Sequence, residues 1–91
     1  MKTTAIYPLV SSVTPLAGKR LLVTFANGGS KIYDCSPLLE EEAFRPLQDD
    51  TLFNSVHVDP HGYAVIWSDE IDLAESEIWI NGETVSSPAD R

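Results

Sequence analysis

A chain of 91 residues is long enough for one folded domain and too short for two, since independent cores usually need about 50–200 residues each. Its hydrophobic content of 43% is near the globular average, and its one cysteine, Cys35, excludes an intrachain disulfide and a zinc site built on cysteines. The net charge is −8 and the six Lys and Arg residues are scattered, so direct binding to nucleic acid is not expected.

The first part of the chain is rich in strand-forming residues. Residues 5–14 predict a β-strand, and Pro8 confines it to a sheet edge or a bend, because proline has no N–H to donate to a neighbouring strand. A proline and a glycine within residues 15–18 predict a turn. A second strand is predicted over residues 20–26, where apolar side chains alternate between two faces.

The sequence Asn27-Gly28-Gly29 lies between that strand and another β-prone run, residues 30–35. Asn-Gly between two such runs is the strongest short-range signal for a hairpin, because both residues tolerate the positive φ of a tight primed turn. The extra glycine indicates a bulge or a three-residue loop. We therefore predict an antiparallel pair of strands here.

A Ser-Pro pair at residues 36–37 predicts the start of a short helix over residues 37–42. Serine can accept a hydrogen bond from a free N–H at the N-cap, and proline in the first turn loses no hydrogen bond. The Arg-Pro pair at residues 45–46 ends the helix, because the residue before proline is disfavoured in the α region. Two aspartates at 49–50 predict a cap on a single turn over residues 51–54.

Residues 55–59 and 63–67 predict a second hairpin around a turn at residues 60–62. Alternation places the two valines of its first strand toward the core and sends His57 and Asp59 to solvent.

Residues 74–80 are compatible with either a short helix or a final strand. The elements together predict an α+β fold, in which a small antiparallel β-sheet is built from two hairpins with short helices packed on it. We expect one α+β domain over residues 1–82 and a flexible C-terminal tail over residues 83–91, because the tail is small, polar and aperiodic.

No apolar run approaches the roughly 18 residues needed to span a bilayer, and the N-terminus lacks the apolar core of a signal peptide. We therefore expect no membrane contact and a cytoplasmic location.

Charge is distributed unevenly along the sequence. Residues 1–33 contain basic side chains and no acid, whereas residues 34–91 hold all fourteen acids. If the two segments fold onto separate surfaces, the domain favours charge-steered pairing with another protein or with itself as a homodimer. The alternative is a solvated surface that only maintains solubility.

His57, Asp59 and His61 are the candidate metal ligands, since alternate residues of a strand share one face. His61 falls in the predicted turn, however, and no further strong ligand is close in sequence. We therefore expect no metal and no cofactor. A small metal- or ligand-binding protein or enzyme centred on these residues remains the alternative function, against the simpler interpretation of two exposed histidines flanking a turn.

A second candidate is the acidic set near the end of the chain, because paired carboxylates act as acid and base where burial raises one pKa. The set comprises Asp69, Glu70, Asp72, Glu75 and Glu77. These residues lie in a polar break and on the outer face of the last element, where nothing desolvates them. Since a glycine-framed nucleophile and a phosphate-binding loop are also missing, we predict that the protein is not an enzyme.

Several short motifs follow one another in a fixed order. They are Thr24-Phe25-Ala26-Asn27-Gly28, Asp34, Ser36-Pro37-Leu38-Leu39, Phe44-Arg45-Pro46-Leu47, Leu52-Phe53-Asn54-Ser55-Val56, Ile66-Trp67 and Ile71-Asp72-Leu73. In order and spacing this set resembles a widespread bacterial and phage family, domain of unknown function family 2442. The resemblance covers roughly residues 8–80.

The resemblance implies a compact α+β fold with a small antiparallel sheet and short helices. Some relatives carry a C-terminal helix-turn-helix module, which this chain is expected to lack. Others are encoded beside another small protein, in an arrangement similar to a toxin–antitoxin pair. The family has no assigned catalytic residues, and its usual Pro-Asn-Gly-like turn after Trp67 is replaced here by Ser68-Asp69-Glu70, which weakens any ligand role for that loop.

Asp34, Trp67 and Asp72 lie at matching positions and are the candidate interaction residues. Each also has a structural interpretation, since the carboxylates can cap local N–H groups and Trp67 can fill space. The charge distribution, the missing catalytic set and the family pattern together predict a small protein-interaction or regulatory module whose partner is another protein, encoded by a neighbouring gene.

Overall fold

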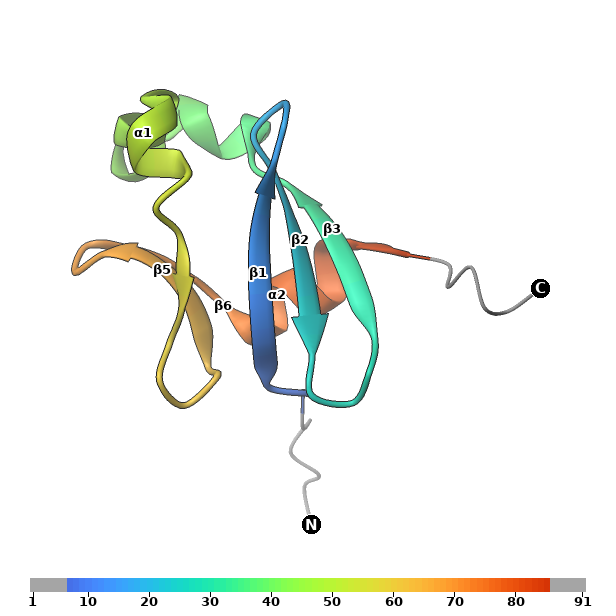
Figure 1. Ribbon diagram of the computed structural model, residues 1–91. Coiled ribbons are helices and arrows are strands. Elements are labelled where there is room, and N and C mark those ends of the chain that lie inside the picture. The colour runs from blue at the N-terminus through green and yellow to red at the C-terminus, as the bar shows by residue number, and fades with distance from the viewer. Residues whose placement is uncertain (1–6, 86–91) are drawn as a thin grey trace, which may run out of the picture.

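Residues 7–85 are the part of the chain that the computed structural model describes, and they contain two antiparallel sheets, a helical segment between them in the sequence and a further helix near residue 80 (Figure 1). The first sheet has the strand order β1-β2-β3-β7 and the second β4-β5-β6. In chain order the elements are β1 (Val10–Leu16), β2 (Arg20–Phe25), β3 (Ser30–Asp34), η1 (Ser36–Glu40), η2 (Glu42–Gln48), α1 (Asp50–Phe53), β4 (His57–Val58), β5 (Ala64–Ser68), β6 (Ile71–Ala74), α2 (Glu75–Asn81) and β7 (Glu83–Thr84). The predicted α+β class is confirmed, although the two hairpins belong to separate sheets.

The hairpin predicted at Asn27-Gly28 joins β2 to β3. Gly28 has a φ of +90°, and the N–H of Gly29 donates to the Asn27 side-chain oxygen at 2.8 Å. Alternation along β2 also follows the prediction, because one face of the strand is buried and forms a wall of the core. The buried residues of this face are Leu21, Val23 and Phe25.

The bounds of β1 differ from the prediction over residues 5–14. The strand begins at Val10 and continues through Pro15, and the turn follows at residues 17–19. Pro15 is tolerated because β1 is an edge strand of its sheet, where a missing N–H need not face a partner. Residues 5 and 6 lie outside the described residues.

The helical segment after β3 begins with two 3-10 helices. No side chain caps η1, and the predicted cap, Ser36, instead donates its hydroxyl to Asp34 Oδ1 at 2.7 Å. Pro46 lies inside η2, since the short i→i+3 runs of a 3-10 helix leave room for a residue without an N–H. The predicted cap of α1 is present, because Asp49 Oδ1 accepts from the N–H of Thr51 at 3.2 Å.

Residues 74–80 contain the end of β6 and most of α2, so this part is mainly helical. Two glutamates lie in the first turn of α2, where carboxylates interact favourably with the helix dipole. Ile78 is fully buried, and Trp79 packs edge-on against Phe25 with ring centroids 5.0 Å apart. None of the helices between residues 7 and 85 has the length and apolar character needed to cross a membrane.

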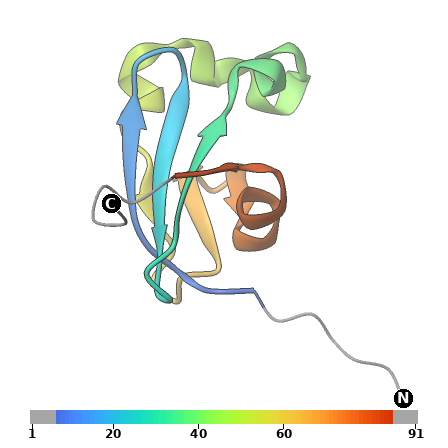
Figure 2. The same ribbon diagram turned by 90° about the vertical axis from the view of Figure 1, so that its right-hand side faces the viewer.

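The two sheets meet where β1 lies beside β4. The N–H of Val10 donates to the Gly62 carbonyl at 2.8 Å. Gly62 has a φ of +80°, and a Cβ there would lie 2.9 Å from the Val10 carbonyl oxygen, so this junction requires glycine. Figures 1 and 2 show η1, η2 and α1 lying across one end of the strands, which closes the core on that side.

The ordered chain continues past residue 82, which corrects the predicted start of the tail. Glu83–Thr84 pairs antiparallel with β3, and the N–H of Val85 donates to the Ser30 carbonyl at 3.1 Å. This strand provides partners for backbone groups on one edge of β3, a requirement that composition does not reveal. Residues 86–91, the rest of the predicted tail, lie outside the described residues.

Tyr33 holds α2 against β3, and its removal should destabilise the fold. The hydroxyl of this buried side chain donates to Glu77 Oε2 at 2.7 Å. Tyr33→Phe should lower the free energy of unfolding by about 1–2 kcal/mol in urea denaturation, because a hydrogen bond to a charged acceptor is lost. The matched control is Tyr63→Phe, since Tyr63 is 57% exposed. Equal losses for the two variants would contradict this role.

Candidate functional site

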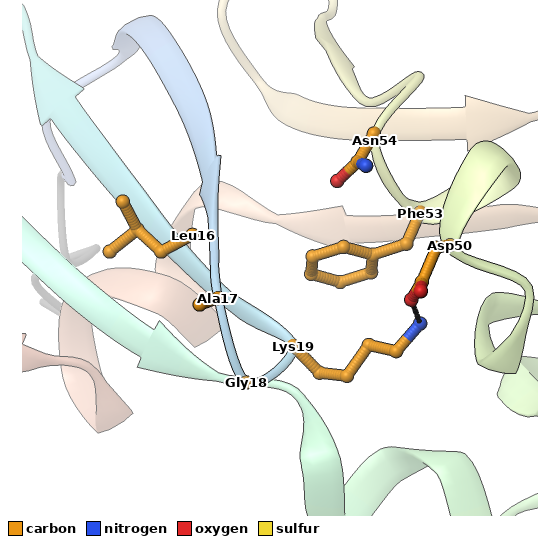
Figure 3. A pocket seen from close by; sticks show the side chains of 7 residues that line it. All are labelled: Leu16, Ala17, Gly18, Lys19, Asp50, Phe53 and Asn54. Carbon is orange, nitrogen blue, oxygen red and sulfur yellow. Dashed lines mark hydrogen bonds and ion pairs between the residues drawn. The ribbon is translucent and has the colours of Figure 1, made fainter.

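A pocket of about 370 Å³ lies between the β1–β2 turn and α1 (Figure 3). Its lining residues are Leu16, Ala17, Gly18, Lys19, Asp50, Phe53 and Asn54. The Lys19 side chain runs past the Phe53 ring to reach Asp50. The volume is near the lower end of the range for small-molecule sites, about 300–1,000 Å³, so the polar groups of the pocket decide what it can do.

Three oxygen atoms surround the Lys19 ammonium group. Nζ donates to the carbonyls of Leu47 at 2.8 Å and Gln48 at 3.1 Å, and to Asp50 Oδ1 at 2.6 Å. It also lies 5.1 Å from the centre of the Phe53 ring. An ammonium group has three N–H donors, so each has a partner here. An anionic ligand would have to displace Asp50. We therefore interpret these hydrogen bonds as structural contacts that hold the β1–β2 turn against the helical segment.

The backbone of the β1–β2 turn places Lys19 in this position. Gly18 and Lys19 have φ values of +81° and +61°, the left-handed conformation that costs a residue other than glycine on the order of 1–2 kcal/mol. The carbonyl of Lys19 accepts from the N–H of Cys35 at 2.8 Å, and the ammonium bonds add to this. Sequence reasoning missed Lys19, because its side-chain partners lie 28 to 31 residues away.

Asp34, the first predicted interaction residue, has a local structural role. Its Oδ1 accepts from the N–H of Ser36 at 2.9 Å and from the Ser36 hydroxyl at 2.7 Å. These hydrogen bonds, with a smaller contribution from Arg20 on the adjacent strand, lower the pKa of the Asp34 carboxyl. These two hydrogen bonds therefore support the interpretation of Asp34 as a local cap.

Trp67, the second predicted interaction residue, belongs to the core. Only 5% of it is exposed, and its Nε1 donates to the Phe53 carbonyl at 3.0 Å. The Trp67 and Phe53 ring centroids are 6.0 Å apart. The side chain therefore connects β5 to the end of α1 and presents no surface to a partner.

Asp72, the third predicted interaction residue, lies on the outer face of the second sheet. Ile66 is paired with His57 on β4 and with Asp72 on β6, so the three residues form a row across the sheet. Adjacent strands are about 4.8 Å apart, which separates the backbones of His57 and Asp72 by about 10 Å. Both of these side chains are exposed.

The structure does not assemble the predicted metal candidates into a ligand set. Asp59 Oδ2 accepts from the backbone N–H groups of His61 at 2.8 Å and Tyr63 at 3.3 Å, which shapes the turn. The His61 ring lies beside Tyr63, at 6.0 Å between centroids, and His57 lies on the outer face of β4. Between residues 7 and 85, no three His, Cys, Asp or Glu side chains are grouped so that they could hold a metal ion.

Two buried groups that could act in catalysis have raised pKa values. Burial, with a smaller effect of Asp34, raises the pKa of the Cys35 thiol to about 12, which keeps it protonated and poorly nucleophilic near neutral pH. Burial, followed by the hydrogen bond to Glu77, also raises the pKa of the Tyr33 hydroxyl.

The basic side chains of the first sheet interact within the domain, as does the lysine of the pocket. Lys31 Nζ lies 4.8 Å from the centre of the Trp79 ring and donates to Thr84 Oγ1 at 2.9 Å. Arg20 Nε donates to the Ala17 carbonyl at 3.0 Å. The acceptors in these contacts are uncharged, so Lys31 and Arg20 keep their positive charge, and Arg20 is exposed.

The acidic side chains, by contrast, are mostly exposed and unpaired. In the described part of the chain, the ion pair between Lys19 and Asp50 is the only one closer than 4 Å. Exposed carboxylates outside this pair include Glu40, Glu41, Glu42, Asp69, Glu70 and Asp72. The surface of the domain is therefore negative, and its excess charge is left for solvent or a partner.

These features define a small acidic α+β domain in which the polar contacts of the pocket connect the β1–β2 turn to the helical segment. A family model, described as protein of unknown function DUF2442, matches residues 10–84. Because the match spans most of the chain, the protein belongs to this family, which confirms the resemblance seen in the motifs. The chain matches no curated protein and no solved structure at a significant level of similarity.

The structural role of Lys19 can be tested by comparing its two kinds of acceptor, the backbone carbonyls and the Asp50 carboxylate. Lys19→Met should lower the free energy of unfolding by about 1–3 kcal/mol, because the Leu47 and Gln48 carbonyls lose a charged donor. Asp50→Asn should cost less than about 1 kcal/mol, since the Asp50 side chain is 85% exposed and its charge is screened. Chemical denaturation of both variants measures the difference. A larger loss of stability for Asp50→Asn than for Lys19→Met would show that the ion pair contributes more than the hydrogen bonds to the two carbonyls.

The hydrogen bonds to Asp34 predict a pH-dependent contribution to stability. Its pKa is lowered in the folded state, so the stabilisation is present above the pKa of the unfolded chain and is lost as pH falls through the folded value. Asp34→Asn should therefore be less stable than wild type at neutral pH, by less than about 1 kcal/mol for this exposed group. The difference should shrink in acid, as urea midpoints across pH would report. A difference that stays constant with pH would argue against this assignment.

Proposed function

We propose that this chain is a protein-interaction module, without enzymatic activity of its own, that binds a basic surface of another protein. The observation that carries the proposal is the excess of exposed carboxylates over cations among the described residues, where only Asp50 is in an ion pair. A surface of one sign attracts a partner of the opposite sign and accelerates its association.

The charge pattern also favours a different protein over a second copy. Two copies of the chain, each with a net charge of −8, would bring like-charged surfaces together. The negative surface that would attract a basic partner therefore repels a second copy of the chain.

The absence of enzymatic activity forms part of the proposal. It is supported by the protonated thiol of Cys35 and by the use of the Asp59 carboxylate in a turn. The pocket next to Asp50 has its ammonium group fully hydrogen-bonded, which leaves no free cation to bind a substrate anion.

The family resemblance indicates where to look for the partner. We propose the small protein encoded beside this one, in a cytoplasmic, toxin–antitoxin-like pair in which one protein regulates the other. A basic neighbouring protein would fit the charge argument, and an acidic one would not.

Binding should be tested with the purified chain and the product of the adjacent gene, by calorimetry and by light scattering after size-exclusion chromatography. We expect a complex at micromolar concentration that weakens at least about tenfold between about 0.1 and about 1 M salt, where the Debye length falls from about 10 to about 3 Å. Replacing Glu40, Glu41 and Glu42 by glutamine tests the helical acids, with Ser12→Ala as an uncharged control. Failure to bind would contradict the proposal, and so would binding that is insensitive to salt.

A further inference from the structure

The free edge of β6 differs from every other edge in the two sheets. β1 contains Pro15 and a bulge beside Val10, and it lies against β4. β4 and β7 have only two residues each. Short strands, proline and bulges are the usual protections of an exposed edge, so these three edges are poor templates for another strand.

β6 pairs with β5 on one side only. It is the last strand of the second sheet, and no backbone hydrogen bond joins its other side to a segment between residues 7 and 85. Alternate residues of an antiparallel strand direct their N–H and C=O groups away from the existing partner. Within Ile71–Ala74, the alternate residues Asp72 and Ala74 therefore direct backbone groups toward the position of an added strand.

The side chains of β6 define the two faces that an added strand would extend. Ile71 and Leu73 are each 6% exposed and face the core, whereas Asp72 and Ala74 are exposed on the outer face. An incoming strand would continue this alternation, with apolar residues toward the core side and polar residues beside Asp72.

The charge around this edge selects the occupant. Asp69 and Glu70 precede β6 in an exposed turn, and Asp72 lies within it. The sequence contains no Lys or Arg between Arg45 and Arg91, so the second sheet has no cation of its own. A second copy would bring another set of these carboxylates to the same edge, which disfavours pairing between two β6 strands.

We infer that the β6 edge binds an extended basic segment of a partner protein by strand addition, with lysine or arginine beside Asp72 and apolar residues at the alternate positions. This inference rests on the proposed function and adds the site and the type of segment. Backbone hydrogen bonds would supply affinity, and the carboxylates would select a cationic sequence.

The test uses synthetic seven-residue peptides with the full-length chain. A peptide alternating lysine and valine should bind and perturb the amide resonances of Ile71–Ala74 in NMR titration. The same peptide with every backbone nitrogen methylated keeps the charge but loses all of its backbone donors, and it should bind at least about tenfold more weakly. A peptide alternating glutamate and valine should not bind.

Protein variants separate strand addition from general attraction to an acidic surface. Asp72→Asn should weaken binding of the lysine–valine peptide severalfold, whereas Glu83→Gln, at an exposed acid in β7 of the other sheet, should leave it unchanged. Equal binding of the N-methylated peptide would overturn the inference, as would equal losses for the two variants. A partner that binds but leaves the β6 amides unperturbed would refute this site while the proposed function stands. Peptide binding at β6 without a complex with the neighbouring protein would support this site and contradict the proposed partner.

Discussion

The contact of the Lys19 ammonium with the helical segment determines how the parts of this fold are held together. It fixes the end of η2 and the start of α1 on the β1–β2 turn. α1 ends in Phe53, whose carbonyl accepts from Trp67 of β5, so the position of the second sheet depends on the same segment. Apolar packing alone is non-directional, whereas these charged and polar contacts define one orientation.

The same arrangement determines which charges reach the surface. Lys19 is paired with Asp50, whereas the exposed carboxylates of η1, η2 and the β5–β6 turn have no cation within 4 Å among the described residues. Net negative charge keeps copies of a protein apart and steers cations toward it. The unpaired carboxylates therefore leave the surface negative, because the few cations of the domain do not balance them.

Local signals predicted the elements wherever neighbouring residues decided the conformation. The turn at Asn27-Gly28 and the cap at Asp49 depend on contacts two or three residues apart, and both are present. The prediction for Ser36 was wrong because Asp34, a charged acceptor two residues earlier, takes its hydroxyl hydrogen. The strand at Glu83–Thr84 was missed because its partner, β3, is distant in sequence.

The sequence by itself determined the α+β class, the first hairpin, the family and the excess of acid, since alternation, turn residues and charge are properties of short segments. Tertiary structure alone decided which of these residues meet. It placed Trp67 in the core and Asp72 on an open sheet face, and it brought Lys19 to Asp50. Contacts between residues that are tens of positions apart depend on how the whole chain packs, and no short pattern contains that information.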